Sequence, residues 1–243
     1  MSIKVIFDTD PGIDDAFALF YTLAHPEIEV IGITTVFGNV PVEISTENAH
    51  ILLEKSLLNK PVLPGASKPL SRPNGNFPYF IHGKDGLGNI GYERPKKIHK
   101  SIDAVNFIID SVYRFPGKIN IIAIGPLTNI ANVIIKDPKI VNIIKSITIM
   151  GGSWIAGGNI SPVAEANIYN DPEAADIVFK SKIPITMVGL DVTHKVFLTN
   201  NQINYLASLG NRSGKFLKEI SSIYVKFYKE TKNMDGCYFH DAT

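Results

Sequence analysis

Four aspartates fall within eight residues near the start of the chain, where residues 8–15 read Asp-Thr-Asp-Pro-Gly-Ile-Asp-Asp. The apolar residues 3–7 before them predict a strand, and the apolar positions that follow recur at the spacing of a helix. Asp8 and Asp10 are therefore expected at the carboxyl end of a strand, and Asp14 and Asp15 in the first turn of the next helix. In an open α/β sheet, this edge is where ligands bind.

The four acids allow two interpretations. Acidic residues stabilise the first turn of a helix, and aspartate favours turns, which accounts for two of the four. Carboxylates packed this closely repel one another unless a cation lies among them, and hard oxygen ligands suit calcium or magnesium. The stretch therefore predicts a metal site, with capping and turn formation as the simpler alternative.

Composition narrows the class of protein. The chain has 243 residues, of which 45% are hydrophobic, enough for a substantial core. A net charge of +1 without a basic run argues against nucleic acid as a partner. Cys237 is the single cysteine, which excludes an internal disulfide and favours a reducing compartment. With neither a signal peptide nor a long apolar segment in view, the sequence predicts a cytoplasmic protein that does not bind membranes.

Strands and helices alternate along the rest of the chain. Strands are predicted at residues 28–37, 119–124, 147–150 and 183–190, and helices at 42–58, 101–115, 199–209 and 213–230, with a further helix from Asp171. This alternation predicts one α/β domain over residues 1–243, with an open, mostly parallel, Rossmann-like sheet and helices on both faces. Polar residues follow the strands at one edge of that sheet, although turn residues concentrate there in any protein: Asp10, Asn39, Asn129, Asn159 and Asp191.

Residues 64–100 form a long segment rich in proline, glycine and asparagine. Residues 86–91 match a dinucleotide-binding fingerprint, but no strand precedes them and no helix follows, so we reject that match. His82 lies beside Gly83 in this segment. It is expected to be exposed, either on a lid over a site or simply on the surface, and the sequence leaves both interpretations open.

Residues 8–16 closely resemble the amino-terminal signature of the inosine-uridine-preferring nucleoside hydrolases. Further segments resemble this family in the same order: Gly-Pro-Leu-Thr-Asn at 125–129, Met-Gly-Gly at 150–152, Glu-Ala-Asn at 165–167, Asp-Pro-Glu-Ala-Ala at 171–175 and His-Asp at 240–241. The resemblance runs from residue 3 to the last residue. It implies calcium-dependent hydrolysis of the N-glycosidic bond of ribonucleosides, and a homodimer or homotetramer.

The resemblance also implies roles for individual residues. One calcium ion would be held by Asp10, Asp15, Asp241 and the backbone carbonyl of Ile124, with Asp10 also the general base toward water. The ribose would be bound or lined by Asp14, Asn39, Met150, Asn159, Glu165 and Asn167. His82 and His240 would lie near the nucleobase as candidate leaving-group acids. Such a set suits a reaction that needs an activated water on one side of an oxocarbenium-like sugar and a proton donor on the other.

Two departures from the family pattern stand out. The family's Glu-Phe-Asn is Glu-Ala-Asn here, and family members continue for several dozen residues beyond the His-Asp pair, where they add helices. The chain is therefore expected to lack those carboxyl-terminal helices. Asp241 would then lie near a chain end, where the backbone is often poorly held, and His240 could be a surface residue at a fraying terminus.

Two other functions compete with nucleoside hydrolysis. Haloacid dehalogenase-like phosphatases also place Asp-x-Asp after a first strand, with Asp8 as nucleophile and magnesium bound. Their motif requires Thr or Val where this chain has Gly12. The second alternative is a non-catalytic homologue that binds nucleoside or calcium without turnover.

Overall fold

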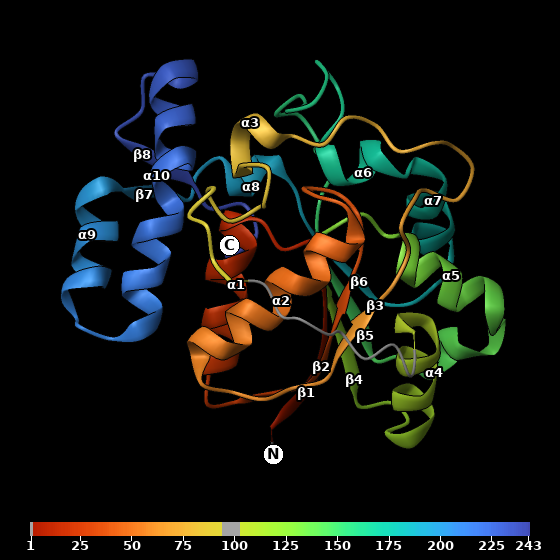
Figure 1. Ribbon diagram of the computed structural model, residues 1–243. Coiled ribbons are helices and arrows are strands. Elements are labelled where there is room, and N and C mark those ends of the chain that lie inside the picture. Colours follow the sequence, from red (N-terminus) through yellow and green to blue (C-terminus); the bar gives the residue numbers. More distant parts are fainter. Residues whose placement is uncertain (1, 94–102) are drawn as a thin grey trace.

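A single parallel sheet of six strands organises the structure, a computed structural model that describes residues 2–93 and 103–243 (Figure 1). The strands lie in the order β3-β2-β1-β4-β5-β6. Their bounds are Ile3–Thr9 (β1), Ile28–Thr35 (β2), Val62–Pro64 (β3), Ile119–Ala123 (β4), Ser146–Met150 (β5) and Ile185–Val188 (β6). The chain leaves β1 toward β2 and returns to β4 on the other side. The topological switch point therefore lies between β1 and β4, at the end of the Asp-rich stretch.

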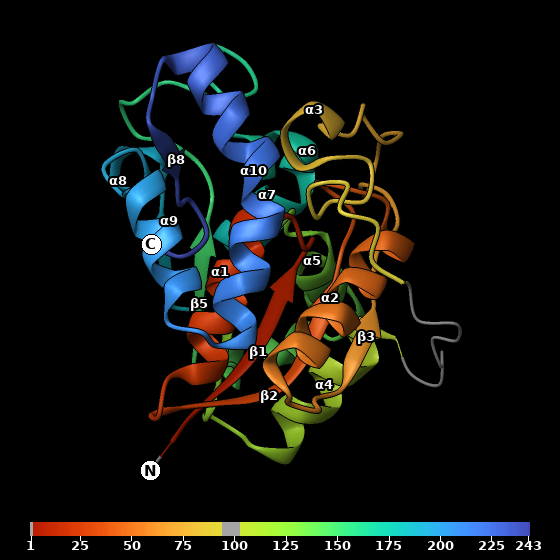
Figure 2. The ribbon, with the colours of Figure 1, turned by 60° about the vertical axis from the view of Figure 1, so that its left-hand side comes forward.

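Helices cover both faces of the sheet, as the alternation predicts (Figures 1 and 2). One face carries α1 (Ile13–Ala24) and α2 (Val42–Ser56), and the other α4 (Ala104–Arg114), α5 (Thr128–Lys136) and α7 (Pro172–Lys180). Successive strand residues point to opposite faces, so Phe7 belongs to the first core and Ile6 to the second. A long helix, α10 (Arg212–Lys232), packs against α1 and α2, with α9 (Asn200–Ser208) beside it.

The end of the chain returns to the centre of the molecule. β7 (Phe197–Thr199) and β8 (Gly236–Tyr238) form an antiparallel pair, and the Phe239 N–H donates to the Val196 carbonyl at 3.1 Å. The Phe239 ring meets Phe17 of α1 edge-on, with 4.3 Å between ring centroids. The backbone that carries Asp241 is therefore held, contrary to the expectation for a chain end.

Element boundaries differ from the predicted ones at a few places. α2 stops at Ser56 because Leu57 adopts a left-handed conformation with φ of 60°. The helix predicted at residues 101–115 would begin at Ser101, which lies outside the described residues. In the structure, Asp103 caps α4 by accepting from the Asn106 N–H at 2.8 Å. The short elements are α3 (Tyr79–His82), a 3-10 helix (Pro138–Asn142), α6 (Ala166–Asn170) and α8 (Leu190–Thr193). Within residues 2–93 and 103–243, no helix combines the length and apolarity needed to cross a membrane.

Candidate active site

The turn between β1 and α1 is fixed by the side chain of Asp15. Its Oδ1 accepts from the Thr9 hydroxyl at 2.5 Å, and its Oδ2 accepts from the Gly12 N–H at 2.9 Å. These bonds satisfy donors at the start of α1, so Asp15 does act as a helix cap. The Asn39 amide also donates to Asp15 Oδ2, at 3.0 Å. Capping therefore accounts for part of the acidic stretch but not for its other carboxylates.

Three carboxylates from the two ends of the chain meet beside this turn. Asp14, Asp15 and Asp241 each offer an oxygen, and these oxygens all lie within 4.8 Å of one another. Burial, and then repulsion from Asp15, raises the pKa of Asp14 to about 7. Burial followed by repulsion from Asp14 and Asp15 holds the pKa of Asp241 well above its usual range. A cluster that resists ionisation in this way is suited to a cation, which would stabilise the charged carboxylates.

Asp10 lies beside this cluster between two stretches of backbone. Gly38 and Gly125 flank its carboxylate so closely that a Cβ on either glycine would overlap it. Asp10 Oδ2 accepts from the Asn39 N–H at 2.7 Å, whereas Oδ1 is buried without a hydrogen-bond partner among the described residues. Burial, and then repulsion from Asp15, holds the pKa of Asp10 well above its usual range. The two glycines were missed as site residues, although Gly125 opens a predicted motif.

Three of the residues expected around a sugar, Met150, Glu165 and Asn167, meet at the ends of β4 and β5. The Asn167 amide donates to the Ile124 carbonyl at 2.9 Å and to the Met150 carbonyl at 3.1 Å. Glu165 is buried and caps α6 by accepting from the N–H groups of Asn167 and Ile168. Burial also raises its pKa.

Asn159 lies farther out than the other residues of the predicted sugar side. Its side chain is exposed, and its Oδ1 accepts from the Ala166 N–H at 2.9 Å. Within the described part of the chain, this side chain makes no hydrogen bond to the acidic cluster. The structure therefore brings together Glu165, Asn167, Met150 and Ile124, and leaves Asn159 at the rim.

His82 is buried, so the expected exposure of this side chain is wrong. Its Nδ1 accepts from the Ile13 N–H at 3.2 Å, and its ring stacks on Tyr224 with 5.3 Å between centroids. Asp14 Oδ1 lies 4.0 Å from the same nitrogen. Burial, and then the nearby His240, lowers the pKa of His82 to about 3. Because Nδ1 accepts a hydrogen bond, the proton of the neutral ring lies on Nε2.

His240 is likewise buried and held on both ring nitrogens. Its Nδ1 lies 2.7 Å from the Thr193 hydroxyl, and its Nε2 lies 3.1 Å from the Tyr228 hydroxyl. Burial, and then the nearby His194, lowers the pKa of His240 to about 4. The interpretation as a surface residue at a fraying terminus is therefore wrong. Tyr228 comes from α10, as does Tyr224, whose hydroxyl donates to Asp14 at 3.2 Å. Sequence reasoning missed both tyrosines.

Comparison with known proteins identifies the family. Residues 5–243 match the family model described as inosine-uridine preferring nucleoside hydrolase. The chain belongs to this family. It is 42% identical over 243 residues to Uridine nucleosidase 1 of Arabidopsis thaliana, across 98% of this chain and 71% of the relative. It is 40% identical over 241 residues to the Inosine-uridine preferring nucleoside hydrolase of Leishmania major, across 97% of this chain and 76% of the relative.

Solved structures of nucleoside hydrolases agree with the fold. A plant nucleoside hydrolase, the PpNRh1 enzyme, superposes with a TM-score of 0.96 at 40% identity, across 100% of this chain and 77% of that chain. A purine-preferring ribonucleoside hydrolase from Gardnerella vaginalis superposes with a TM-score of 0.92 at 38% identity, across 98% and 77% of the two chains. The Rossmann-like sheet predicted from the sequence is thus confirmed as that of a nucleoside hydrolase.

The phosphatase alternative is wrong for this nucleoside hydrolase. Asp8, which that alternative requires as a nucleophile, is fully buried within β1. One of its oxygens accepts from the Thr34 hydroxyl and from the Asn129 amide. Asp191 also has a structural role, because it accepts from the N–H groups of Trp154, Ile155 and Ala156 and fixes that loop. Asp191 itself lies in the short helix α8 (Leu190–Thr193) rather than in a turn.

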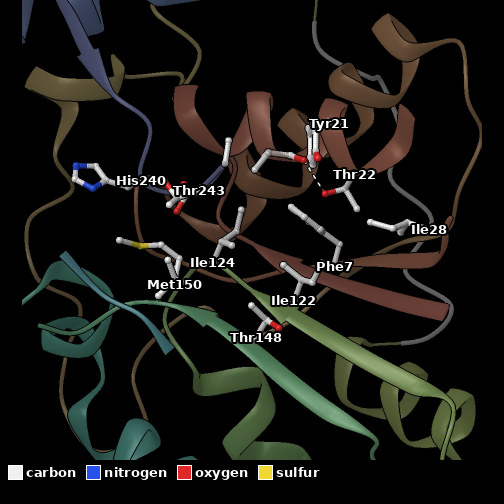
Figure 3. Close-up of a pocket in the computed structure, with 14 residues that line it drawn as sticks. Phe7, Tyr21, Thr22, Ile28, Ile122, Ile124, Thr148, Met150, His240 and Thr243 are labelled. Atoms are coloured by element: carbon white, nitrogen blue, oxygen red, sulfur yellow. Dashed lines mark hydrogen bonds between the residues drawn. The ribbon is translucent and has the colours of Figure 1, made fainter. Parts of the chain in front are cut away.

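A cavity of about 330 Å³ lies between α1 and the sheet (Figure 3). Apolar side chains such as Phe7, Ile122 and Met150 form most of its wall, and Ile124, His240 and Asp241 also line it. Among the residues that line it, Asp10, Asn39, Glu165 and Asn167 are absent. A sugar with several hydroxyls would therefore not bind in this cavity but above it, at the carboxyl ends of the strands.

Proposed function

We propose that this nucleoside hydrolase cleaves the N-glycosidic bond of ribonucleosides such as uridine and inosine, with release of the free base and ribose. The observation that carries the proposal is the meeting of Asp14, Asp15 and Asp241, which are drawn from both ends of the chain, with Asp10 close enough to interact with them electrostatically. The names of the relatives support the substrate class, since they include uridine nucleosidases and inosine-uridine preferring hydrolases. A role in nucleoside catabolism and salvage follows from that chemistry.

The residues present fit a calcium ion. All of their donors are hard oxygens, and the buried Oδ1 of Asp10 has no partner among the described residues. We assign Asp10, Asp15, Asp241 and the carbonyl of Ile124 as the residues that would hold the ion. Asp14 is close enough to Asp15 and Asp241 to take part. When bound, calcium would lower the pKa of a coordinated water and orient it.

The remaining steps belong to the side chains. Asp10 would take a proton from the attacking water, with its carboxylate held in place by Gly38, Gly125 and the Asn39 N–H. The ribose hydroxyls would bind Asp14, Asn39, Glu165 and Asn167, with Met150 and Asn159 along the sugar side. Hydrogen bonds to these hydroxyls would hold the anomeric carbon next to the water, which lowers the entropic cost of reaching the transition state.

The two histidines would assist the leaving base, but not as imidazolium ions of near-neutral pKa. Burial lowers the pKa of His82 to about 3 and that of His240 to about 4, so both rings are neutral at pH 7. A neutral ring still donates one N–H. We therefore assign His82, whose Nε2 carries the proton, a hydrogen bond to the departing base rather than the transfer of a stored proton. His240 would assist the base only by exchanging one of its contacts with Thr193 and Tyr228, since both of its ring nitrogens are engaged.

We also propose a domain organisation, an oligomeric state and a cellular compartment. We treat residues 1–243 as one nucleoside hydrolase-like domain. The likeness to the family supports a homodimer or homotetramer. The single cysteine, Cys237, which is buried and free, supports the cytoplasm as the compartment.

Sugar release under controlled metal content tests the proposal. Uridine and inosine would each be incubated with the chain, with chelator, and with calcium or magnesium added back, while reducing sugar is measured. We expect release that chelation stops and calcium restores. Asp10→Asn should abolish it, and Asp176→Asn, at an exposed surface pair with Lys180, should not. Tight nucleoside binding without release would favour the non-catalytic alternative, and release that Asp10→Asn leaves intact would contradict the roles assigned here.

A further inference from the structure

We propose that Asn129 is a positioning residue for Asp10. Asn129 acts at a distance, through the loop of residues 36–41. The proposal rests on the proposed role of Asp10 as base and metal ligand. Asn129 lies in the first turn of α5 and is fully buried. It has no place in the ligand set, the sugar grip or the leaving-group pair described above.

The amide of Asn129 joins the ends of three strands. Its Nδ2 donates to Asp8 Oδ1 at 2.8 Å and to the Thr35 carbonyl at 3.0 Å. Its Oδ1 accepts from the Ala66 N–H at 2.8 Å. β1, β2 and the segment after β3 are therefore tied to one planar group, and Gly65 packs so closely on it that a Cβ there would overlap the amide.

From these anchors the connection to Asp10 is short. The Ala66 carbonyl accepts from the Phe37 N–H at 3.1 Å, and the Thr35 carbonyl accepts from the Gly65 N–H at 2.9 Å. Phe37 is followed by Gly38, which packs against the carboxylate of Asp10, and by Asn39, whose N–H donates to Asp10 Oδ2. A shift of the strand ends at Thr35 and Ala66 would therefore move two of the groups that hold Asp10.

Few other side chains could make this set of bonds. The site requires two donors and one acceptor from a group of fixed geometry, and a carboxamide supplies them. An aspartate at position 129 would keep the acceptor for Ala66 but would place an oxygen against both Asp8 and the Thr35 carbonyl. That substitution changes the charge and hydrogen bonding with almost no change in shape.

Thr128 offers a matched control in the same helical turn. It is buried, and its hydroxyl donates to Asp171 Oδ2 at 2.6 Å. The same oxygen accepts from the Leu70 N–H at 3.0 Å, so this contact holds the segment around Leu70 and not the loop of residues 36–41. Thr128→Val removes one buried hydrogen bond to a carboxylate, whereas Asn129→Asp removes the bonds to Asp8 and to the Thr35 carbonyl. Only the second substitution affects the connection to Asp10.

The experiment compares kcat, KM and melting temperature for Asn129→Asp, Thr128→Val and the double variant Asp8→Asn/Asn129→Asp. The double variant restores a hydrogen bond between positions 8 and 129 but leaves the Thr35 carbonyl without its donor. We expect Asn129→Asp to lower kcat by about 10- to 100-fold, the usual effect of groups behind a metal ligand, with little change in KM. The double variant should regain most of the melting temperature but not kcat, and Thr128→Val should keep kcat.

Two results would overturn the inference: an equal loss of kcat in Thr128→Val, or full recovery of kcat in the double variant. If the wild-type chain releases no ribose, the proposed function fails, and the rise in melting temperature on adding calcium then decides the inference alone. A rise that is lost in both position-129 variants and kept in Thr128→Val would support the positioning role. An unchanged rise in every variant would overturn it.

Discussion

At the scale of single residues, the site depends on backbone that comes very close to side chains. Gly12, Gly38 and Gly125 all lie where a Cβ would meet a functional group, and at Gly12 it would lie 2.7 Å from His82 Nδ1 and 2.8 Å from the Asn39 amide. In the sequence these glycines indicate turns, which is true but incomplete. Their second role depends on which side chain comes to lie over them, and that is set by the packing of separate strands.

The first prediction concerns Gly125. In Gly125→Ala the new methyl group would overlap the carboxylate of Asp10, so the carboxylate must move. A displacement of about 1 Å of a reacting group can cost about 100-fold in rate, and we expect a loss of about 10- to 100-fold in kcat. Steady-state hydrolysis of uridine measures it. Gly75→Ala is the control, since nothing lies within 4 Å of a Cβ at Gly75, and an equal loss there would contradict the steric explanation.

Residue-scale sequence reasoning was accurate for the aspartates and wrong for the histidines. The spacing within residues 8–15 is local, and it placed Asp10, Asp14 and Asp15 at the strand-to-helix junction where the structure has them. His82, by contrast, is bonded to a backbone group 69 residues away, and His240 to a hydroxyl 47 residues away. Burial produced by such distant partners leaves no local pattern in the sequence.

At the scale of elements, two helices, α3 and α10, converge on the start of α1. α3 supplies His82 as acceptor for the Ile13 N–H, and α10 supplies Tyr224 against Asp14. The apolar pattern of α10 predicted a buried face but not the tyrosines that turn it into part of the site. The hydroxyls of Tyr224 and Tyr228 also reach Asp14 and His240 on other elements, partners that the helix alone does not specify.

The second prediction separates the structural and chemical roles of His82. His82→Phe removes the acceptor for a buried N–H at the start of α1, which should cost about 1–3 kcal/mol of stability. His82→Asn places Oδ1 near the position of Nδ1, so it should keep part of that stability, whereas both variants should lose turnover. Urea unfolding and uridine hydrolysis measure the two effects. Equal stability of the two variants would argue against the capping role, and wild-type turnover in His82→Asn would remove His82 from the leaving-group step.

At the scale of the whole molecule, the fold joins its first and last residues. The order of strand and helix was enough to predict a parallel sheet with helices on both faces, because those rules depend on alternation alone. The meeting of Asp241 with Asp14 and Asp15 was not visible in that alternation. It came from the family resemblance, and the pairing of β7 with β8 and the packing of Phe239 on Phe17 explain it physically.

The third prediction is a pH dependence of stability. Burial raises the pKa of Asp14 from 3.8 to about 7, so the folded state binds this proton more tightly than the unfolded state. The stabilisation is complete below the unfolded pKa and is lost as the pH rises through the folded pKa. Without calcium, Asp14 should therefore lower the melting temperature as the pH rises from about 4 to about 7. Burial lowers the pKa of His82 and of His240, which act in the opposite direction below about pH 6.5, so the contribution of Asp14 is measured as the difference between the wild type and Asp14→Asn. That difference should change in favour of Asp14→Asn as the pH rises, and calcium should reduce the change. A difference that does not vary with pH would contradict the assignment.

Calorimetric titration of calcium into the chelator-treated protein tests the central claim most directly, since it asks whether the four aspartates form a cation site. We predict one calcium ion bound per chain, with release of protons detected as a dependence of the heat on the buffer, because burial raises the pKa values of Asp14, Asp15 and Asp241. Asp241→Asn should weaken binding sharply and Asp176→Asn should not. An absence of calcium binding, or binding that Asp241→Asn leaves unchanged, would contradict the account.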